Sequence, residues 1–128
     1  MRVCILGSGL TALTLAKALV NQNIFVDLVS SNKNHKINHS RTVGISKSNF
    51  NYFNKNIINI EKISWKINKI EIYTDKDKNE KILNFENSDN QLFSMIKNYQ
   101  LYEVLTKNLF KNKYFKKIKP KKKLIKTD

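Results

Sequence analysis

The chain has 128 residues, a length that allows one domain. It contains a single cysteine, which excludes a disulfide-stabilised scaffold. Its formal charge of +14 would suggest a polyanion partner, but Arg2 and Arg41 are the only arginines, and the lysines accompany asparagines and isoleucines, which A/T-rich codons encode. No apolar run approaches the roughly twenty residues of a membrane span. Composition favours a cytoplasmic protein that binds no nucleic acid, with the lysine-rich segment 116–126 as the alternative polyanion site.

The first thirty residues predict a strand, a glycine turn, a helix and a second strand. The apolar run 2–6 leads into the turn. Apolar residues then recur at helical spacing from Leu10 to Val20, with Lys17 on the opposite, polar face. A second apolar segment follows at 24–29. This order is the setting in which a glycine turn and a helix N-terminus hold a dinucleotide pyrophosphate.

Each position of the turn has a physical task in such a site. Gly7 would make the tight turn, Gly9 would let the phosphates approach the backbone, and Ala12 is small enough for close helix packing. The alternative is a βα unit whose glycines only shape the turn. The candidate cofactor-binding residues of the turn are Gly7, Ser8, Gly9, Leu10, Thr11 and Ala12.

The end of the second strand lacks the acidic residue that usually holds the ribose hydroxyls of a dinucleotide. Ser30 stands at this position and Ser31 follows it, and both are candidate cofactor contacts. A serine can hydrogen-bond a ribose hydroxyl without offering a charged acceptor. We therefore expect a weaker contact with the adenosine half.

Cysteine and histidine residues give no sign of a metal site. Cys4 lies in the first strand and is expected to be a buried small residue. His35 and His39 belong to a polar loop without a neighbouring cysteine or carboxylate cluster. We assign no metal ligand and no catalytic residue from the sequence.

The middle of the chain predicts a short helix and a hairpin. Ser46 is the expected N-cap of a helix over 48–53. Extended stretches at 65–74 and 81–86 flank the turn-rich segment 75–79, which is a hairpin pattern.

The remaining residues predict a strand at 92–96 and a helix over 100–109. Leu101, Leu105 and Leu109 share one face of that helix. An alternating, strand-like stretch follows within 113–128. The predicted fold class is α/β, a Rossmann-like dinucleotide-binding βαβ unit with an added β-hairpin.

Three segments in this order resemble the start of the ubiquinone-biosynthesis hydroxylases (2-polyprenyl-6-methoxyphenol hydroxylase-like), a branch of the FAD-dependent aromatic monooxygenases. They are the glycine turn 7–12, the segment 41–46 with the strand 67–72, and the segment 95–101 with Leu105. Together they span roughly residues 2 to 110. The resemblance implies that residues 1–128 are the N-terminal portion of an FAD/NAD(P)-binding domain, incomplete relative to the full family fold.

The resemblance also implies a cofactor and a reaction. FAD would place its ADP half on the glycine turn, and Arg41 would approach the cofactor near its phosphates or the flavin linkage. Asn98 is a further candidate cofactor-binding residue. NAD(P)H would reduce the flavin, and a polyprenylated phenol of ubiquinone biosynthesis would then be hydroxylated with molecular oxygen. Association with the inner membrane surface or with a biosynthetic complex is a further expectation. No catalysis is expected from these 128 residues alone.

The chain departs from the family pattern at several positions. Ser30 replaces the acidic ribose ligand, Gly44 replaces an alanine, and Lys97 replaces a glutamate. The family's later Asp-Gly and Gly-Asp elements do not occur in these residues. Two alternatives therefore stay open: another FAD- or NAD-dependent oxidoreductase with the same βαβ opening, and a non-catalytic basic module that binds nucleic acid or anionic lipid.

Overall fold

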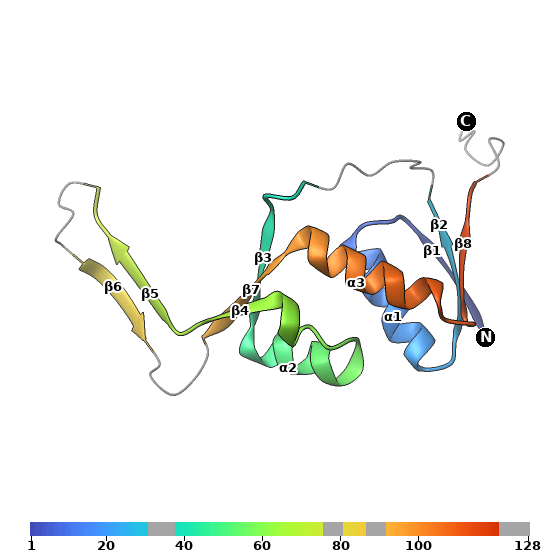
Figure 1. The fold of residues 1–128 in the computed structure, drawn as a ribbon, viewed down its shortest axis with the longest axis horizontal. Coiled ribbons are helices and arrows are strands. Elements are labelled where there is room, and N and C mark those ends of the chain that lie inside the picture. The colour runs from blue at the N-terminus through green and yellow to red at the C-terminus, as the bar shows by residue number, and fades with distance from the viewer. Residues whose placement is uncertain (31–37, 76–80, 87–91, 121–128) are drawn as a thin grey trace.

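The computed structural model describes residues 1–30, 38–75, 81–86 and 92–120. In these residues the strands form three small sheets, with strand orders β1-β2-β8, β3-β7-β4 and β5-β6. Figure 1 shows the first sheet at one end of the molecule and the second near the centre. The third sheet projects from the other end as an arm.

The first sheet contains the predicted βαβ unit. Strand β1 (Arg2–Leu6) is followed by helix α1 (Leu10–Asn21) and by strand β2 (Phe25–Val29), which pairs in parallel with β1. Strand β8 (Phe115–Ile118) pairs in parallel with the other side of β2. The α/β prediction is confirmed, and the strand-like stretch near the C-terminus becomes the third strand of this sheet.

Helices α1 and α3 (Asn98–Phe110) run side by side on the same face of this sheet (Figure 1). The predicted apolar face of α3 is confirmed, because Leu101, Leu105 and Leu109 are only 3%, 0% and 0% exposed. They belong to the hydrophobic core that also contains Val26 and Leu28 of β2. Burying a large aliphatic side chain contributes about 1.5–3 kcal/mol, so this face is what fixes α3 against α1 and the sheet.

The second sheet is antiparallel. Its central strand β7 (Phe93–Lys97) pairs with β3 (Thr42–Ser46) on one side and with β4 (Ser64–Ile67) on the other. Ile96 of β7 is fully buried, and so is the neighbouring Ser94. Because β7 runs directly into α3, this sheet fixes where α3 begins.

Helix α2 (Lys47–Asn56) follows β3 without a break, and a short 3-10 turn, η1 (Glu61–Ile63), precedes β4. The backbone N–H of Asn49 donates to Ser46 Oγ at 3.3 Å, which confirms the predicted N-cap. A serine at this position satisfies one of the free N–H groups of the first helical turn.

The arm is the predicted hairpin. Strands β5 (Lys69–Tyr73) and β6 (Lys81–Glu86) pair antiparallel, with an irregularity between Ile72 and Tyr73. The extended stretch predicted at 65–74 is divided in the structure, because Asn68 separates β4 from β5. Residues 76–79 of the expected turn lie outside the described residues.

Two burial predictions were wrong. Cys4 is exposed, because strand alternation directs Val3 and Ile5 toward the helices and Cys4 toward the opposite face of the sheet. Lys17 is buried on α1 at 8% exposure, and its Nζ donates to Asn21 Oδ1 at 2.6 Å. Burial lowers the pKa of Lys17 because removal from water disfavours the charged form.

The surroundings of Lys17 explain why this residue of the predicted polar face of α1 is buried. Asn21 Nδ2 donates to the carbonyl oxygens of Asn56 and Ile57, both at 2.9 Å. These carbonyls lie at the C-terminal end of α2, where a helix leaves acceptors unsatisfied. The predicted polar face of α1 therefore joins α1 to α2.

Candidate functional site

Gly7 is required by the backbone of the turn. Its φ is +126°, a conformation that residues with a side chain rarely adopt. Its N–H donates to the carbonyl oxygen of Val29 at 2.9 Å, which ties the turn to the end of β2. A Cβ at Gly7 would lie 3.9 Å from Ala12 Cβ, so the strain of a substitution would come from φ and not from crowding.

Gly9 differs from Gly7 because nothing in the described structure requires it to be glycine. Its φ of −76° suits any residue, and a Cβ built there meets no atom within 4 Å. Gly9 is also the N-cap of α1, where glycine is tolerated but serine or aspartate is preferred. A Cβ at Gly9 would fill open space directly before the helix N-terminus.

The N-terminus of α1 is arranged to receive an anion. None of the described side chains caps the helix, and its first turn contains no acidic residue. The N–H groups of Leu10, Thr11 and Ala12 stand in that first turn, where the helix provides no carbonyl partners. Free N–H donors and the helix dipole both favour a phosphate at this end.

Ser8 is the buried residue of the turn. Its side chain is buried, and it shares a small internal cavity with Tyr102 and Thr106 of α3. Thr106 Oγ1, which is buried, has no hydrogen-bond partner among the described residues. The turn is therefore tied to the end of β2, and the small cavity lies between Ser8 and α3.

Ser30 lies beside the turn, as a ribose contact would require. It follows Val29, the residue whose carbonyl accepts from Gly7, and its own N–H donates to the Ile118 carbonyl at 3.3 Å. Ser30 is 8% exposed. Ser31 lies outside the described residues.

Arg41 and Asn98 are brought together at the start of the second sheet. The N–H of Asn98 donates to the Arg41 carbonyl at 3.0 Å, which joins the residue before β3 to the first residue of α3. The Arg41 side chain is exposed. Asn98 Oδ1 is buried and has no hydrogen-bond partner among the described residues. A buried acceptor without a partner is costly, so Asn98 suits a ligand that donates a hydrogen bond.

The two groups of candidate residues lie near one another along α3. Tyr102, which lines the cavity beside Ser8, comes four residues after Asn98. Four helical residues correspond to a rise of about 6 Å. Asn98 is therefore about one helical turn before Tyr102, the α3 residue that lines a cavity with Ser8.

Sequence reasoning missed Gln100 and Thr106. Gln100 Oε1 is buried without a partner among the described residues, like Asn98 Oδ1. Their polar character was visible in the sequence of the predicted helix. Whether their side chains are buried depends on how α3 packs against α1, which the sequence does not show. No group of three potential metal ligands gathers in the described parts of the chain.

Comparison with solved structures identifies the class of fold. The chain superposes on p-nitrophenol 4-monooxygenase PnpA from Pseudomonas putida with a TM-score of 0.75 and 11% identity, covering 92% of this chain and 32% of that one. It superposes on PqsL, a probable FAD-dependent monooxygenase from Pseudomonas aeruginosa, with a TM-score of 0.73 and 14% identity, covering 93% and 33%. HpxO from Klebsiella pneumoniae, solved with FAD and uric acid, gives 0.69 and 14%, covering 91% and 30%.

These comparisons establish that the chain has the fold of the N-terminal part of FAD-dependent monooxygenases. The chain spans about a third of the length of each of these structures. No protein-family model and no curated protein sequence matches it. Among the described residues, no helix is long and apolar enough to cross a membrane.

Proposed function

We propose that this chain binds FAD at the glycine turn and forms the N-terminal portion of an FAD/NAD(P)-binding domain in a flavin-dependent monooxygenase. The observation that carries the proposal is Gly9. Its glycine identity serves neither the backbone nor the packing of the described structure, and the space before it adjoins uncapped helix N–H groups. A phosphate that contacts the main chain explains both features.

Each candidate residue is assigned to one part of FAD. The N–H groups of the first turn of α1 would hold the pyrophosphate, and Ser30 with Ser31 would contact the adenosine ribose. The exposed Arg41 guanidinium can approach a phosphate. Asn98 Oδ1, for which the described residues offer no hydrogen-bond partner, can accept from a ribityl hydroxyl. Bound FAD supplies the redox chemistry, and these residues bind and orient it.

The finer part of the proposal concerns the reaction. Hydroxylation of a polyprenylated phenol in ubiquinone biosynthesis, with NAD(P)H as electron donor, is supported by the order of the 7–12, 41–46 and 95–101 segments. Two of the similar proteins are connected with small aromatic or heteroaromatic compounds: PnpA is a p-nitrophenol 4-monooxygenase, and HpxO was solved with uric acid. The substrate-contacting residues would lie outside this chain, and a polyprenyl tail would favour association with a membrane surface or a biosynthetic complex.

A titration of the purified chain with FAD tests the cofactor. Quenching of flavin fluorescence would be measured with ADP, NADP⁺ and heparin as competitors. Saturable binding that ADP weakens and heparin does not is the expected result. Binding of NADP⁺ without FAD would support the alternative oxidoreductase, and salt-sensitive binding of heparin alone would support the polyanion module.

A further inference from the structure

Strand β8 presents different side chains to the two faces of the first sheet. Phe115 packs against the hydrophobic core. Two residues further on, Lys117 lines the small cavity that Ser8 of the glycine turn also lines. Side chains alternate along a strand, so Lys116 faces the opposite side, where the register pairs it with Asp27. Lys117 is therefore the lysine of β8 on the helix side of the sheet, beside the glycine turn.

Lys119 lies beside Ser30, the expected ribose contact. The N–H of Ser30 donates to the Ile118 carbonyl at 3.3 Å, and continuing the register of β2 and β8 by one residue places Ser30 next to Lys119. Pro120 follows, and a residue before proline stays extended, so Lys119 keeps the alternation and faces the same side as Lys117. Figure 1 shows the ends of β2 and β8 side by side at the edge of the sheet where the glycine turn leaves β1. The two lysines therefore stand at the adenosine end of the proposed nucleotide site.

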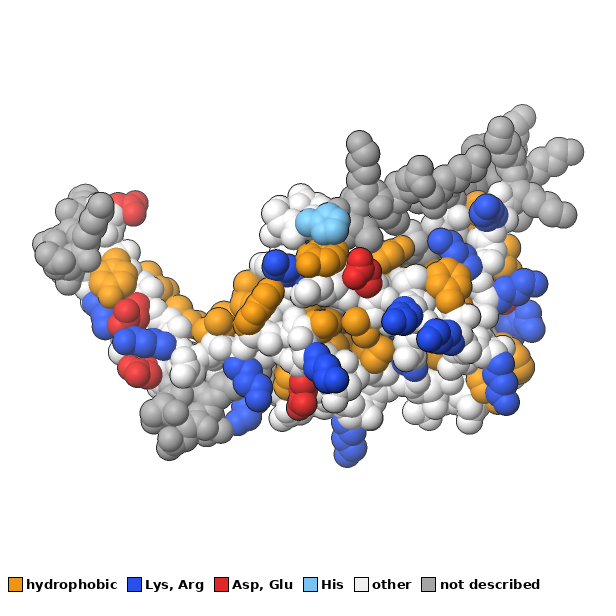
Figure 2. Space-filling view, viewed as in Figure 1, with side chains coloured by type: hydrophobic (Ala, Val, Ile, Leu, Met, Phe, Trp, Pro, Cys, Tyr) orange, Lys and Arg blue, Asp and Glu red, His pale blue; other side chains and the backbone are white. Residues whose placement is uncertain are grey.

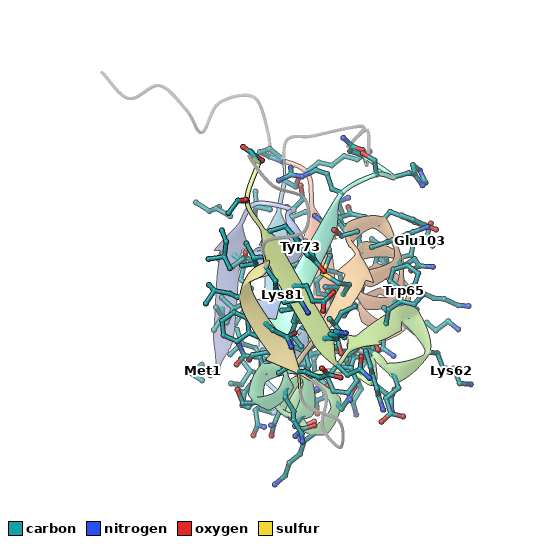
Figure 3. The ribbon with its side chains drawn as sticks, turned by 90° about the vertical axis from the view of Figure 1, so that its left-hand side faces the viewer. Met1, Lys62, Trp65, Tyr73, Lys81 and Glu103 are labelled. Carbon is teal, nitrogen blue, oxygen red and sulfur yellow. The ribbon has the colours of Figure 1, made fainter. Side chains whose placement is uncertain are left out.

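Neither lysine is paired with a carboxylate among the described residues. Lys117 and Lys119 are both exposed, and no ion pair of either occurs in that part of the chain. Asp27 is the only carboxylate in the described strands of the first sheet, and it lies 3.3 Å from Arg2 on the opposite face. Figure 3 shows Glu103 on the outer side of α3, away from this sheet, and Figure 2 shows basic side chains gathered over the end of the molecule that contains β8. The sheet edge therefore carries positive charge where dinucleotide sites usually carry a carboxylate.

We propose that Lys117 and Lys119 make the adenosine end of the site cationic, so that it binds an adenosine nucleotide more tightly when the ribose carries a 2′-phosphate. This specificity rests on the proposed function, since it needs a nucleotide at the glycine turn. A carboxylate beside the ribose accepts from its hydroxyls and repels a phosphate attached there. An ammonium group attracts that phosphate, and on an unmodified ribose, as in FAD, it donates to a hydroxyl oxygen. Ser30 brings no charge and is compatible with both ligands.

The exposure of both lysines sets the size of the effect. An exposed ion pair changes an equilibrium constant by about fivefold at most. With two lysines able to reach one phosphate, we expect the affinity to rise about three- to tenfold when the 2′-phosphate is added. Salt should reduce this gain, because mobile ions screen exposed charges.

NMR titration of the isotope-labelled chain with AMP and with adenosine 2′,5′-bisphosphate tests the specificity, since the two nucleotides differ only in the 2′-phosphate. Amide shifts of residues 7–12 report occupation of the glycine turn. The expected result is a dissociation constant about three- to tenfold lower for the bisphosphate than for AMP. Replacing both lysines, Lys117→Gln with Lys119→Gln, should remove the difference.

The matched control is Lys113→Gln with Lys116→Gln. It removes the same charge from β8 and its approach, but Lys116 faces the opposite side of the sheet and Lys113 precedes the strand at its other end. This variant should retain the difference between the two nucleotides. Both double variants change only exposed side chains, so the core that holds β8 stays intact in each.

Two outcomes would overturn the specificity and leave the proposed function in place. In the first, AMP and the bisphosphate shift the turn amides with equal affinity. In the second, the bisphosphate binds more tightly but the Lys117→Gln, Lys119→Gln variant keeps the difference, which would assign the gain to the overall charge of +14. Residues 7–12 that respond to neither nucleotide nor to FAD would instead refute nucleotide binding at the turn, and with it both proposals.

Discussion

The different structural duties of Gly7 and Gly9 lead to a prediction that separates folding from cofactor binding. Gly9→Ser should leave the fold intact and remove FAD binding, whereas Gly7→Ala should lower stability. Serine is a good N-cap, and a side chain at Gly9 meets no atom of the described structure within 4 Å. A loss of binding in Gly9→Ser therefore cannot be attributed to fraying of α1.

The magnitudes follow from the geometry of each glycine. At Gly9 a change from glycine to serine as N-cap should alter the free energy of unfolding by only a few tenths of a kcal/mol. The same side chain would displace the phosphates from two or more N–H donors, each worth about 1.5 kcal/mol or more to a charged group. FAD affinity should then fall by about 100-fold. At Gly7 the φ of +126° predicts a loss of about 1–3 kcal/mol of stability.

Two measurements on the same samples check this prediction. Urea denaturation followed by the fluorescence of Trp65, the single tryptophan, gives the free energy of unfolding. Quenching of flavin fluorescence gives the FAD dissociation constant. If Gly9→Ser binds FAD as tightly as the unmodified chain, the reasoning is refuted and the turn serves only the architecture.

Three further predictions concern the core, a strand glycine and the arm. Leu105→Ala should lower the free energy of unfolding by about 2–5 kcal/mol in urea denaturation, because Leu105 is 0% exposed; a loss below 1 kcal/mol would contradict the core assignment. Gly44→Ala should raise the free energy of unfolding by about 0.4–1 kcal/mol, since its new Cβ would stand 3.5 Å from Phe93, an ordinary contact; a lower midpoint in the same assay would show hidden strain. Contact with Lys81 lowers the pKa of Glu71 from 4.5 to about 2, so this pairing stabilises the arm above pH 4.5 and is lost as the pH falls toward 2; an NMR titration of Glu71 with an ordinary midpoint would disprove the pairing.

Local signals predicted much of the fold. The glycine turn, the helical spacing after Leu10 and the Ser46 cap each depend on neighbours in sequence, and the structure confirms the elements that they predict. Burial was less predictable because it depends on distant partners. Cys4 looked like a core residue until the pairing of β1 directed it to the uncovered side of the sheet. Lys17 looked exposed until α2 packed beside it through Asn21.

In the candidate site, too, local sequence patterns identified some residues, whereas contacts between distant residues appeared only in the structure. The sequence pattern identified the glycines, and Ser30 could be placed beside them because parallel strands end at one edge of a sheet. The backbone hydrogen bond between Arg41 and Asn98 spans more than fifty residues of chain, and no local pattern predicts it. The side-chain oxygens of Asn98 and Gln100 are buried without a partner in the part of the chain that the structure describes, and this also follows only from how α3 packs.

The described structure does not itself need a glycine at position 9. A glycine without a backbone or packing reason leaves room at an N–H-rich helix end, and the chemistry that fits this room is an anion.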